Sequence, residues 1–163
     1  MFHGTLLGIF TAPSSGEPMV EHAQIAATVA CGLAGDRYAT DVARHPRGYT
    51  KIRHVTLLEE ETVAALARDH EIVVTPIQLR RNLVTRGVPL NHLIGRRFRI
   101  GDVVLEGTEL AEPCQYLADL LGLPVLKPMI HRGGIRAAIV VGGTLRAGDP
   151  IAPEDPERSE GPT

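Results

Sequence analysis

The sequence contains no tryptophan and few other aromatic residues, with three tyrosines and three phenylalanines among 163 residues. Proteins that bind single-stranded nucleic acid stack the bases on aromatic side chains, so this scarcity argues against a nucleic-acid partner. No apolar run approaches the roughly 20 residues of a membrane helix. The N-terminal stretch MFHGTLLGIFTAP also lacks the basic segment that opens a signal peptide. We therefore expect a cytoplasmic protein without a membrane partner.

Cysteine is equally scarce, because the chain has only Cys31 and Cys114. Two distant cysteines without an export signal are typical of free thiols in a reducing compartment rather than of a disulfide. The cysteines and the seven histidines show no zinc-site spacing, so we expect no structural zinc. Cys31 is expected to lie in the core.

The net charge of −2 conceals an uneven distribution. Residues 80–150 carry 10 Lys or Arg against 6 Asp or Glu, whereas residues 151–163 carry 1 against 4. Fifteen of the 17 basic residues are arginine, whose planar fork suits bidentate recognition of phosphate or carboxylate. The composition therefore favours a small anionic ligand.

Short apolar segments separated by turn-forming residues predict a mainly β protein with a few helices. The segment at residues 22–39 has features of both a helix and a strand, and we interpret it as a strand that enters a loop. Two motifs of the form apolar-Arg-x-Gly-Asp, at residues 98–102 and 145–149, predict hairpin corners. The other expected strands cover residues 3–10, 54–58, 81–85, 103–110 and 135–141, and the expected helices cover residues 59–69 and 113–121, with one helical turn at residues 90–94.

This pattern predicts an α+β fold built on a curled or closed, barrel-like mixed sheet. Neither G-x-G-x-x-G nor G-x-x-x-x-G-K occurs, so a nucleotide-binding Rossmann or P-loop fold is unsupported. We expect a single domain over residues 1–151, followed by an acidic, Pro- and Gly-rich disordered tail at residues 152–163. The long polar segment at residues 35–53 is interpreted as a mobile lid over a ligand site.

Cys114 is the candidate reactive residue. Proline is favoured at the first helical position, so Pro113 predicts that Cys114 lies in the first turn of a helix. Unpaired amides and the positive end of the helix dipole favour a thiolate there. Glu109 and Glu112 oppose this effect if they lie nearby, whereas several basic residues would assist it if the fold gathers them, namely Arg81, Arg86, His131, Arg132 and Arg136. The alternative is that Cys114 is a small buried apolar residue, as most free cysteines are.

Four segments resemble, in this order, the MOSC domain, which is named for the C-terminal domain of molybdenum-cofactor sulfurase. They are CGLAGDRYA, RHVTLLEEE, RRNLVTRGVPLNHLIGRRFRIGDVVLEGTELAEPC and HRGGIRAAIVVGGTLRAGDPI. The resemblance covers residues 3–151 and is closest to small stand-alone bacterial MOSC proteins. It implies a MOSC-type barrel in which Cys114 carries sulfur or ligates the metal of a molybdenum cofactor (molybdopterin).

The same resemblance assigns cofactor-binding roles to residues around that cysteine. It implies that Arg81, Asn82 and Arg136 lie near the pterin phosphate. Arg37 and His131 are further candidate cofactor-binding residues. One departure concerns Tyr38, because the family often has histidine after the GDR motif. Structural alternatives remain: Asn82 can cap a backbone group, Arg37 can form a turn pair with Asp36, and His131 can be a surface residue.

The resulting functional hypothesis is a molybdenum-cofactor protein in which Cys114 is a metal ligand or a persulfide sulfur carrier. As an oxidoreductase it would reduce N-hydroxylated substrates with an electron-donor protein, and as a sulfur-transfer protein it would need a cysteine desulfurase. The alternative is a non-catalytic barrel module that binds a phosphorylated small molecule or a partner protein. The first hypothesis predicts that Arg81, Asn82, Cys114 and Arg136 share one concave surface.

Overall fold

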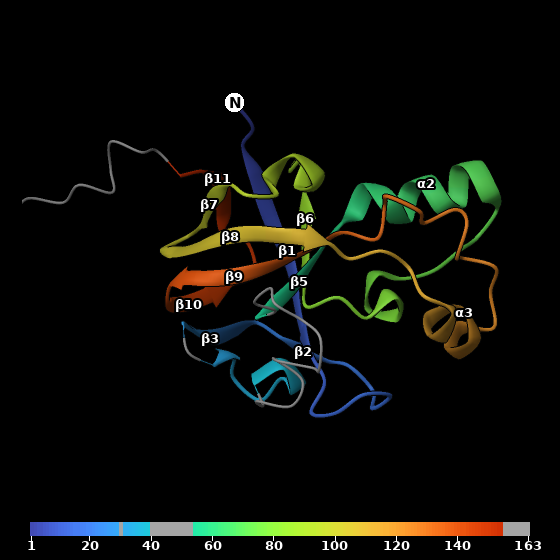
Figure 1. Cartoon of the computed structure of the whole chain (residues 1–163), viewed down its shortest axis with the longest axis horizontal. Coiled ribbons are helices and arrows are strands. Elements are labelled where there is room, and N and C mark those ends of the chain that lie inside the picture. Colours follow the sequence, from blue (N-terminus) through green and yellow to red (C-terminus); the bar gives the residue numbers. More distant parts are fainter. Residues whose placement is uncertain (30, 40–53, 155–163) are drawn as a thin grey trace, which may run out of the picture.

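A closed mixed β-barrel forms the centre of the computed structural model, which describes residues 1–29, 31–39 and 54–154 (Figure 1). Its seven strands follow the order β11-β7-β8-β9-β5-β6-β1, and pairing of β11 with β1 closes the barrel. The strand bounds are β1 Gly4–Thr11, β5 Val55–Glu59, β6 Leu83–Arg86, β7 Arg97–Ile100, β8 Val103–Leu110, β9 Ile135–Val141 and β11 Pro150–Pro153. The predicted barrel-like mixed sheet is confirmed.

Smaller strands extend this barrel. β2 (Val20–His22) pairs with β1, while β10 (Gly143–Arg146), β3 (Gln24–Thr28) and β4 (Gly32–Leu33) form a separate three-stranded sheet. Residues 22–39 are interpreted above as a strand that enters a loop, and the strand is confirmed as β3. Cys31 is exposed, so its expected place in the core is wrong.

The parallel pairing of β5 and β6 makes the sheet mixed. Parallel neighbours need a crossover connection, and the chain supplies one through α2 (Glu60–His70) and the 3-10 helix η2 (Pro76–Leu79). Glu60 and Glu61 occupy the first turn of α2 and Arg68 and His70 the last, which complements the helix dipole. Thr75 and Gln78 form a capping box on η2, which holds the chain before β6.

Two hydrophobic clusters stabilise the fold. The barrel interior contains large, fully buried side chains such as Leu6, Phe98 and Leu105. A second cluster outside the barrel includes Leu58, Leu66, Leu117 and Met129, and it packs α2 and α3 (Gln115–Leu121) against the barrel wall. This second cluster fixes the position of α3.

In the described residues, no helix is both long and apolar enough to cross a membrane.

The two Gly-Asp corners differ. Gly101 and Asp102 join β7 to β8 as a hairpin, as predicted. The expected hairpin at residues 145–149 is wrong, because β10 pairs with β3 whereas β11 pairs with β1 and β7. This corner therefore carries the chain from the small sheet into the barrel, and Arg146 N donates a 2.8 Å hydrogen bond to Asp149 Oδ2 within it.

The expected disordered tail does not include residues 152–154. Ala152 and Pro153 belong to β11 and pair with β7, and Arg99 donates a 3.0 Å hydrogen bond to Glu154. Backbone pairing beside the buried Ile151 thus orders the chain up to Glu154. Residues 155–163 lie outside the described residues, as do residues 40–53 of the segment interpreted as a lid. The remaining part of that segment includes a short 3-10 helix, η1 (Arg37–Ala39).

Candidate anion and thiol site

Cys114 is the N-cap of α3 rather than a residue of its first turn, because the helix begins at Gln115 instead of residue 113. Its backbone is extended, with φ −128° and ψ 160°, and its carbonyl accepts hydrogen bonds from Leu117 N and Ala118 N. The side chain makes no capping hydrogen bond and the residue is exposed. The exposure contradicts the alternative that Cys114 is a buried packing residue.

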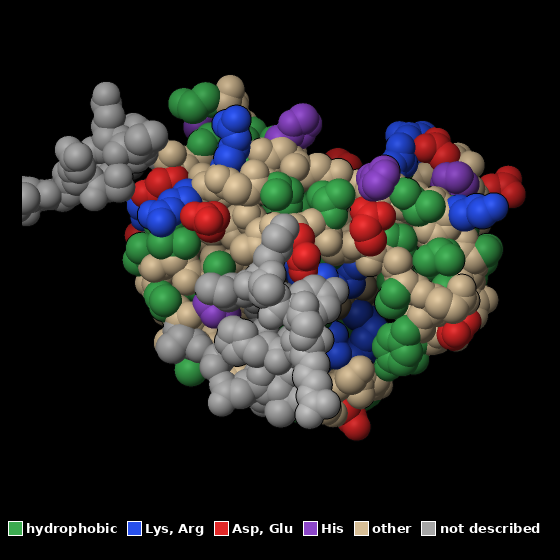
Figure 2. All heavy atoms as spheres, viewed as in Figure 1, with side chains coloured by type: hydrophobic (Ala, Val, Ile, Leu, Met, Phe, Trp, Pro, Cys, Tyr) green, Lys and Arg blue, Asp and Glu red, His purple; other side chains and the backbone are tan. Residues whose placement is uncertain are grey.

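A cavity of about 140 Å³ opens beside this thiol. Figure 2 shows basic side chains gathered in a hollow between the barrel and α3. The cavity is lined by Ala12, Ser15, Met19, Asp36, Arg37, Tyr38, Arg80, Arg81, Asn82, Glu112, Cys114, Tyr116, Leu117 and Arg136. The structure therefore brings together five of the six predicted site residues, including the four expected to share a concave surface.

Arg81 donates hydrogen bonds to both of the segments that flank α3. Its Nε donates to Gly133 O at 2.8 Å and its Nη2 to Ala111 O at 2.9 Å. Burial lowers the pKa of Arg81 to about 10; Tyr38 and Cys114 act against this, while Arg136 and Arg37 add to it. Arg81 remains protonated at neutral pH, so it supplies a fixed positive charge beside the thiol.

Gly133 and Gly134 permit this close packing before β9. A Cβ at Gly133 would overlap Ala111 O, and one at Gly134, where φ is +91°, would overlap Leu57 O. The absent side chains let the chain pass between β5 and the segment before Cys114. Arg136 follows two residues later in β9 and reaches the cavity, where its Nη1 donates to Glu109 Oε1 at 3.0 Å.

Asn82 lines the cavity but its amide is committed to the protein. Its Nδ2 donates to Phe10 O at 3.0 Å and to Asp36 Oδ1 at 3.2 Å, and its Oδ1 accepts hydrogen bonds from Thr56 N and Thr56 Oγ1. Both amide hydrogens and both acceptor positions are therefore occupied. Asn82 acts on the site by positioning Asp36 and the first residues of β6.

Asp36 lies under the cavity as a buried carboxylate. Ala12 N donates to its Oδ1 at 3.1 Å and Tyr38 N to its Oδ2 at 3.2 Å. Burial raises the pKa of Asp36 despite these hydrogen bonds and the nearby charge of Arg37. The Asp36 carboxylate accepts the hydrogen bond from Tyr38 N and thereby holds η1, with Arg37 and Tyr38, in place. Its role therefore goes beyond a local turn pair with Arg37.

Arg37 and Tyr38 form one unit at the cavity wall. Arg37 Nη2 donates to Tyr38 Oη at 2.8 Å, and its guanidinium lies 4.6 Å from the centroid of the Tyr38 ring. Because the tyrosine oxygen accepts from Arg37, its hydroxyl hydrogen can point to a ligand. Tyr38 thus presents a hydrogen-bond donor at the site.

Arg80 is a site residue that sequence analysis did not select. It caps η2 in the left-handed region, with φ 58°. Within residues 1–29, 31–39 and 54–154, its guanidinium has no hydrogen-bond or ion-pair partner, although it lines the cavity. The Arg-Arg pair before β6 is the sequence signal that could have identified it, since Arg80 and Arg81 both line the cavity.

His131 does not line the cavity. It is exposed, and its backbone N and ring Nδ1 both contact Glu112, at 3.0 and 3.2 Å from Oε1. It therefore affects the site through Glu112, which is a cavity residue. Of the other basic residues considered, Arg86 pairs with Glu60 and Arg132 lies 3.8 Å from Asp69, so neither assists Cys114.

The donor set fits a metal that arrives as part of a larger anionic ligand. No group of three or more His, Cys, Asp or Glu in the described part of the chain could hold a metal ion. A single exposed thiol beside Arg37, Arg80, Arg81 and Arg136 instead matches a ligand with both a soft metal or sulfur end and a negatively charged end. The fold and site thus define a small barrel protein with a thiol and an arginine-rich cavity.

This chain belongs to the MOSC domain family, whose model matches residues 44–152. The resemblance recognised in the sequence is therefore confirmed. The family is associated with the molybdenum cofactor. No match to a curated protein was found.

Solved structures share the fold. YuaD from Bacillus subtilis superposes with a TM-score of 0.75 at 18% identity, covering 93% of this chain and 97% of that one. YiiM from Escherichia coli gives a TM-score of 0.65 at 20% identity, over 95% of this chain and 70% of the other. YiiM from Geobacillus stearothermophilus gives 0.63 at 13% identity, over 93% and 73%. At these identities the likeness establishes the barrel architecture.

Proposed function

We propose that the cavity beside Cys114 binds the molybdenum cofactor, with the arginines holding its phosphate and Cys114 meeting its metal or carrying sulfur. The observation that carries this proposal is the exposed thiol in one cavity with four guanidinium groups. Guanidinium forks match phosphate geometry, and a thiolate is both a soft metal ligand and a sulfur nucleophile. When bound, the cofactor would supply redox chemistry at its metal.

The cavity encloses only part of such a ligand. Its volume of about 140 Å³ lies below the roughly 300–1,000 Å³ of sites that enclose a whole drug-sized ligand. The cavity volume is instead suited to one charged end of the cofactor. Arg80 and Arg81 would neutralise that end, while Arg136 and Arg37 would orient it through their contacts with Glu109 and Tyr38.

Two chemistries are open to Cys114 at this site. As a metal ligand it would serve an oxidoreductase acting on N-hydroxylated substrates, with electrons from a separate donor protein. As a carrier, its thiolate would attack the outer sulfur of a cysteine desulfurase persulfide. A Cys114 persulfide would form while the desulfurase thiolate leaves. Both need the accessible thiol that the structure shows.

Metal and pterin analysis of protein purified from a host that makes the cofactor tests the proposal. We expect molybdenum and pterin in the native chain, and loss of molybdenum or of persulfide sulfur in Cys114→Ser. Cys31→Ser is the matched control, because Cys31 is the other exposed free cysteine. Absence of both pterin and persulfide from the native chain, or equal loss in the two variants, would refute the proposal and favour a non-catalytic binding module.

A further inference from the structure

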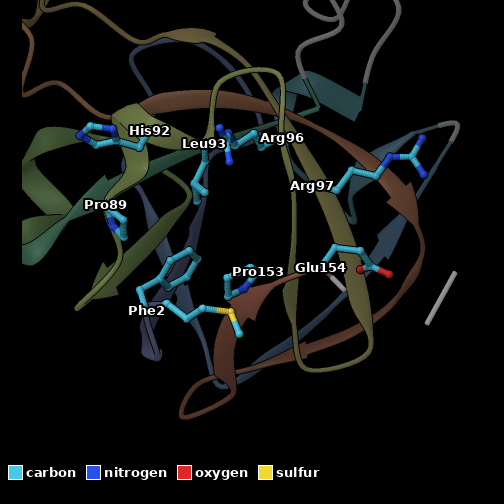
Figure 3. A pocket seen from close by; sticks show the side chains of 9 residues that line it. Phe2, Pro89, His92, Leu93, Arg96, Arg97, Pro153 and Glu154 are labelled. Carbon is cyan, nitrogen blue, oxygen red and sulfur yellow. The ribbon is translucent and has the colours of Figure 1, made fainter. Parts of the chain in front are cut away.

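A second and larger cavity lies beside the N-terminal residues Met1 and Phe2 (Figure 3). Its volume is about 700 Å³, within the range of roughly 300–1,000 Å³ that is usual for small-molecule sites. It shares no lining residue with the cavity beside Cys114. Any ligand here is therefore independent of the proposed cofactor site.

The floor of this cavity is apolar. Figure 3 shows Phe2, Leu93 and Pro153 at its centre, contributed by the N-terminal segment, by η3 (Leu90–Leu93) and by β11. Leu93 is buried, and Phe2 packs partly buried against the barrel core. Because these three segments are held by the closed barrel, the floor is preformed.

The rim is positively charged. Arg96 stands beside Leu93 in Figure 3, and in the described portion of the chain its guanidinium has no hydrogen-bond or ion-pair partner. Arg97 pairs with Glu106 at 3.2 Å, and Glu154 Oε1 pairs with Arg99 at 3.0 Å. Met1, which carries the α-amino group, and His92 also line the cavity, and among the described residues Glu154 Oε2 is buried without a hydrogen-bond partner. An anionic head group placed at Arg96 would therefore meet an unpaired guanidinium, while the lining carboxylate of Glu154 is already paired with Arg99.

We propose that this cavity binds a small apolar molecule with a single anionic head group, such as an aromatic carboxylate. The apolar body would cover Phe2, Leu93 and Pro153, while the head group would take the guanidinium fork of Arg96. The volume suits a compact ligand of this kind. The match of an apolar floor to one free guanidinium decides the chemical class.

Calorimetric titration with naphthoate and with neutral naphthalenemethanol tests this assignment, since the two probes share a ring and differ in charge. We expect naphthoate to bind about tenfold more tightly or better. Arg96→Gln should remove most of this preference, because only the α-amino group of Met1 and His92 would remain as cations, and Arg96→Lys should retain more of it. Arg97→Gln, at a paired neighbour, and Arg80→Gln, in the other cavity, should leave the preference unchanged within about twofold.

Several results would overturn the proposal. Equal binding of the two probes would show that the cavity recognises no anion, and absence of saturable naphthoate binding would show that it is not a ligand site. An effect of Arg80→Gln without one of Arg96→Gln would place naphthoate beside Cys114. Unchanged thermal unfolding of Arg96→Gln establishes that a lost preference does not come from misfolding.

Discussion

Asn82 Nδ2 donates a 3.2 Å hydrogen bond to Asp36 Oδ1 across 46 positions of sequence, and both residues are buried beneath the candidate site. The same amide joins β6 to β5 through Thr56 and to β1 through Phe10 O. One side chain therefore couples the closure of the barrel wall to the position of Asp36, Arg37 and Tyr38 at the cavity.

Replacement of Asn82 should destabilise the protein and displace η1. Asn82→Ala leaves buried partners on Thr56, Phe10 and Asp36 unsatisfied, and each such group costs about 1–3 kcal/mol. We expect a loss of about 3 kcal/mol or more in the free energy of unfolding, measured by urea denaturation. Asn91→Ala is the control, because Asn91 donates one exposed hydrogen bond to His131 O. Equal losses in the two variants would contradict a central role for Asn82.

The raised pKa of Asp36 predicts a pH dependence of stability. The folded protein holds the Asp36 proton more tightly than the unfolded chain, whose aspartate pKa is about 3.9. The contribution of Asp36 to stability is thus fully present below about pH 3.9 and declines as pH rises through the folded-state pKa. The decline amounts to about 1.4 kcal/mol for each unit that separates the two pKa values.

Urea denaturation of the native chain and of Asp36→Asn across this pH window measures the effect. The native chain should lose stability relative to Asp36→Asn as pH increases, whatever constant offset the substitution introduces. Parallel pH profiles for the two proteins would show that burial does not raise the Asp36 pKa.

Gly134 and Gly122 provide a matched test of close packing. Both have positive φ, at 91° and 64°, but an added Cβ overlaps Leu57 O at Gly134 and meets nothing within 4 Å at Gly122. Gly122→Ala should cost about 1–2 kcal/mol for the left-handed backbone alone. Gly134→Ala should cost at least about 2 kcal/mol more, because β9 must move away from β5. Similar unfolding midpoints for the two variants would argue against this packing.

Substitutions of the arginines and substitution of Cys114 should affect different properties of the candidate site. Arg80→Gln and Arg136→Ala each remove a charge-assisted contact and should weaken pterin retention about 10- to 100-fold while leaving Cys114 open to alkylation. Cys114→Ser should abolish metal ligation or persulfide formation yet keep part of the pterin binding. Pterin content, molybdenum content and thiol alkylation measured on the same preparations distinguish the variants, with Arg96→Gln as a control at the other cavity. Full activity of Cys114→Ser with a molybdenum-dependent substrate would make the thiol dispensable.

The local pattern of residues was enough to predict most elements and the barrel, because apolar segments, Gly-Asp turns and acidic helix starts act over a few positions. The strand at β5, the helix α2 and the β7–β8 hairpin all follow from such signals. The MOSC motifs likewise pointed to Cys114, Arg81, Asn82, Arg136 and Arg37 as neighbours. All five of these residues line the cavity beside α3.

Only the tertiary structure decided which groups are available to a ligand. The Asn82 amide is saturated by Thr56, Phe10 and Asp36, while Arg80, with a backbone φ of 58°, lines the cavity. The second Gly-Asp corner joins two sheets rather than two paired strands, and Cys114 caps α3 instead of lying within it. Each of these outcomes depends on hydrogen bonds and packing between residues dozens of positions apart, and a sequence pattern read over one turn or one strand contains no information on such contacts.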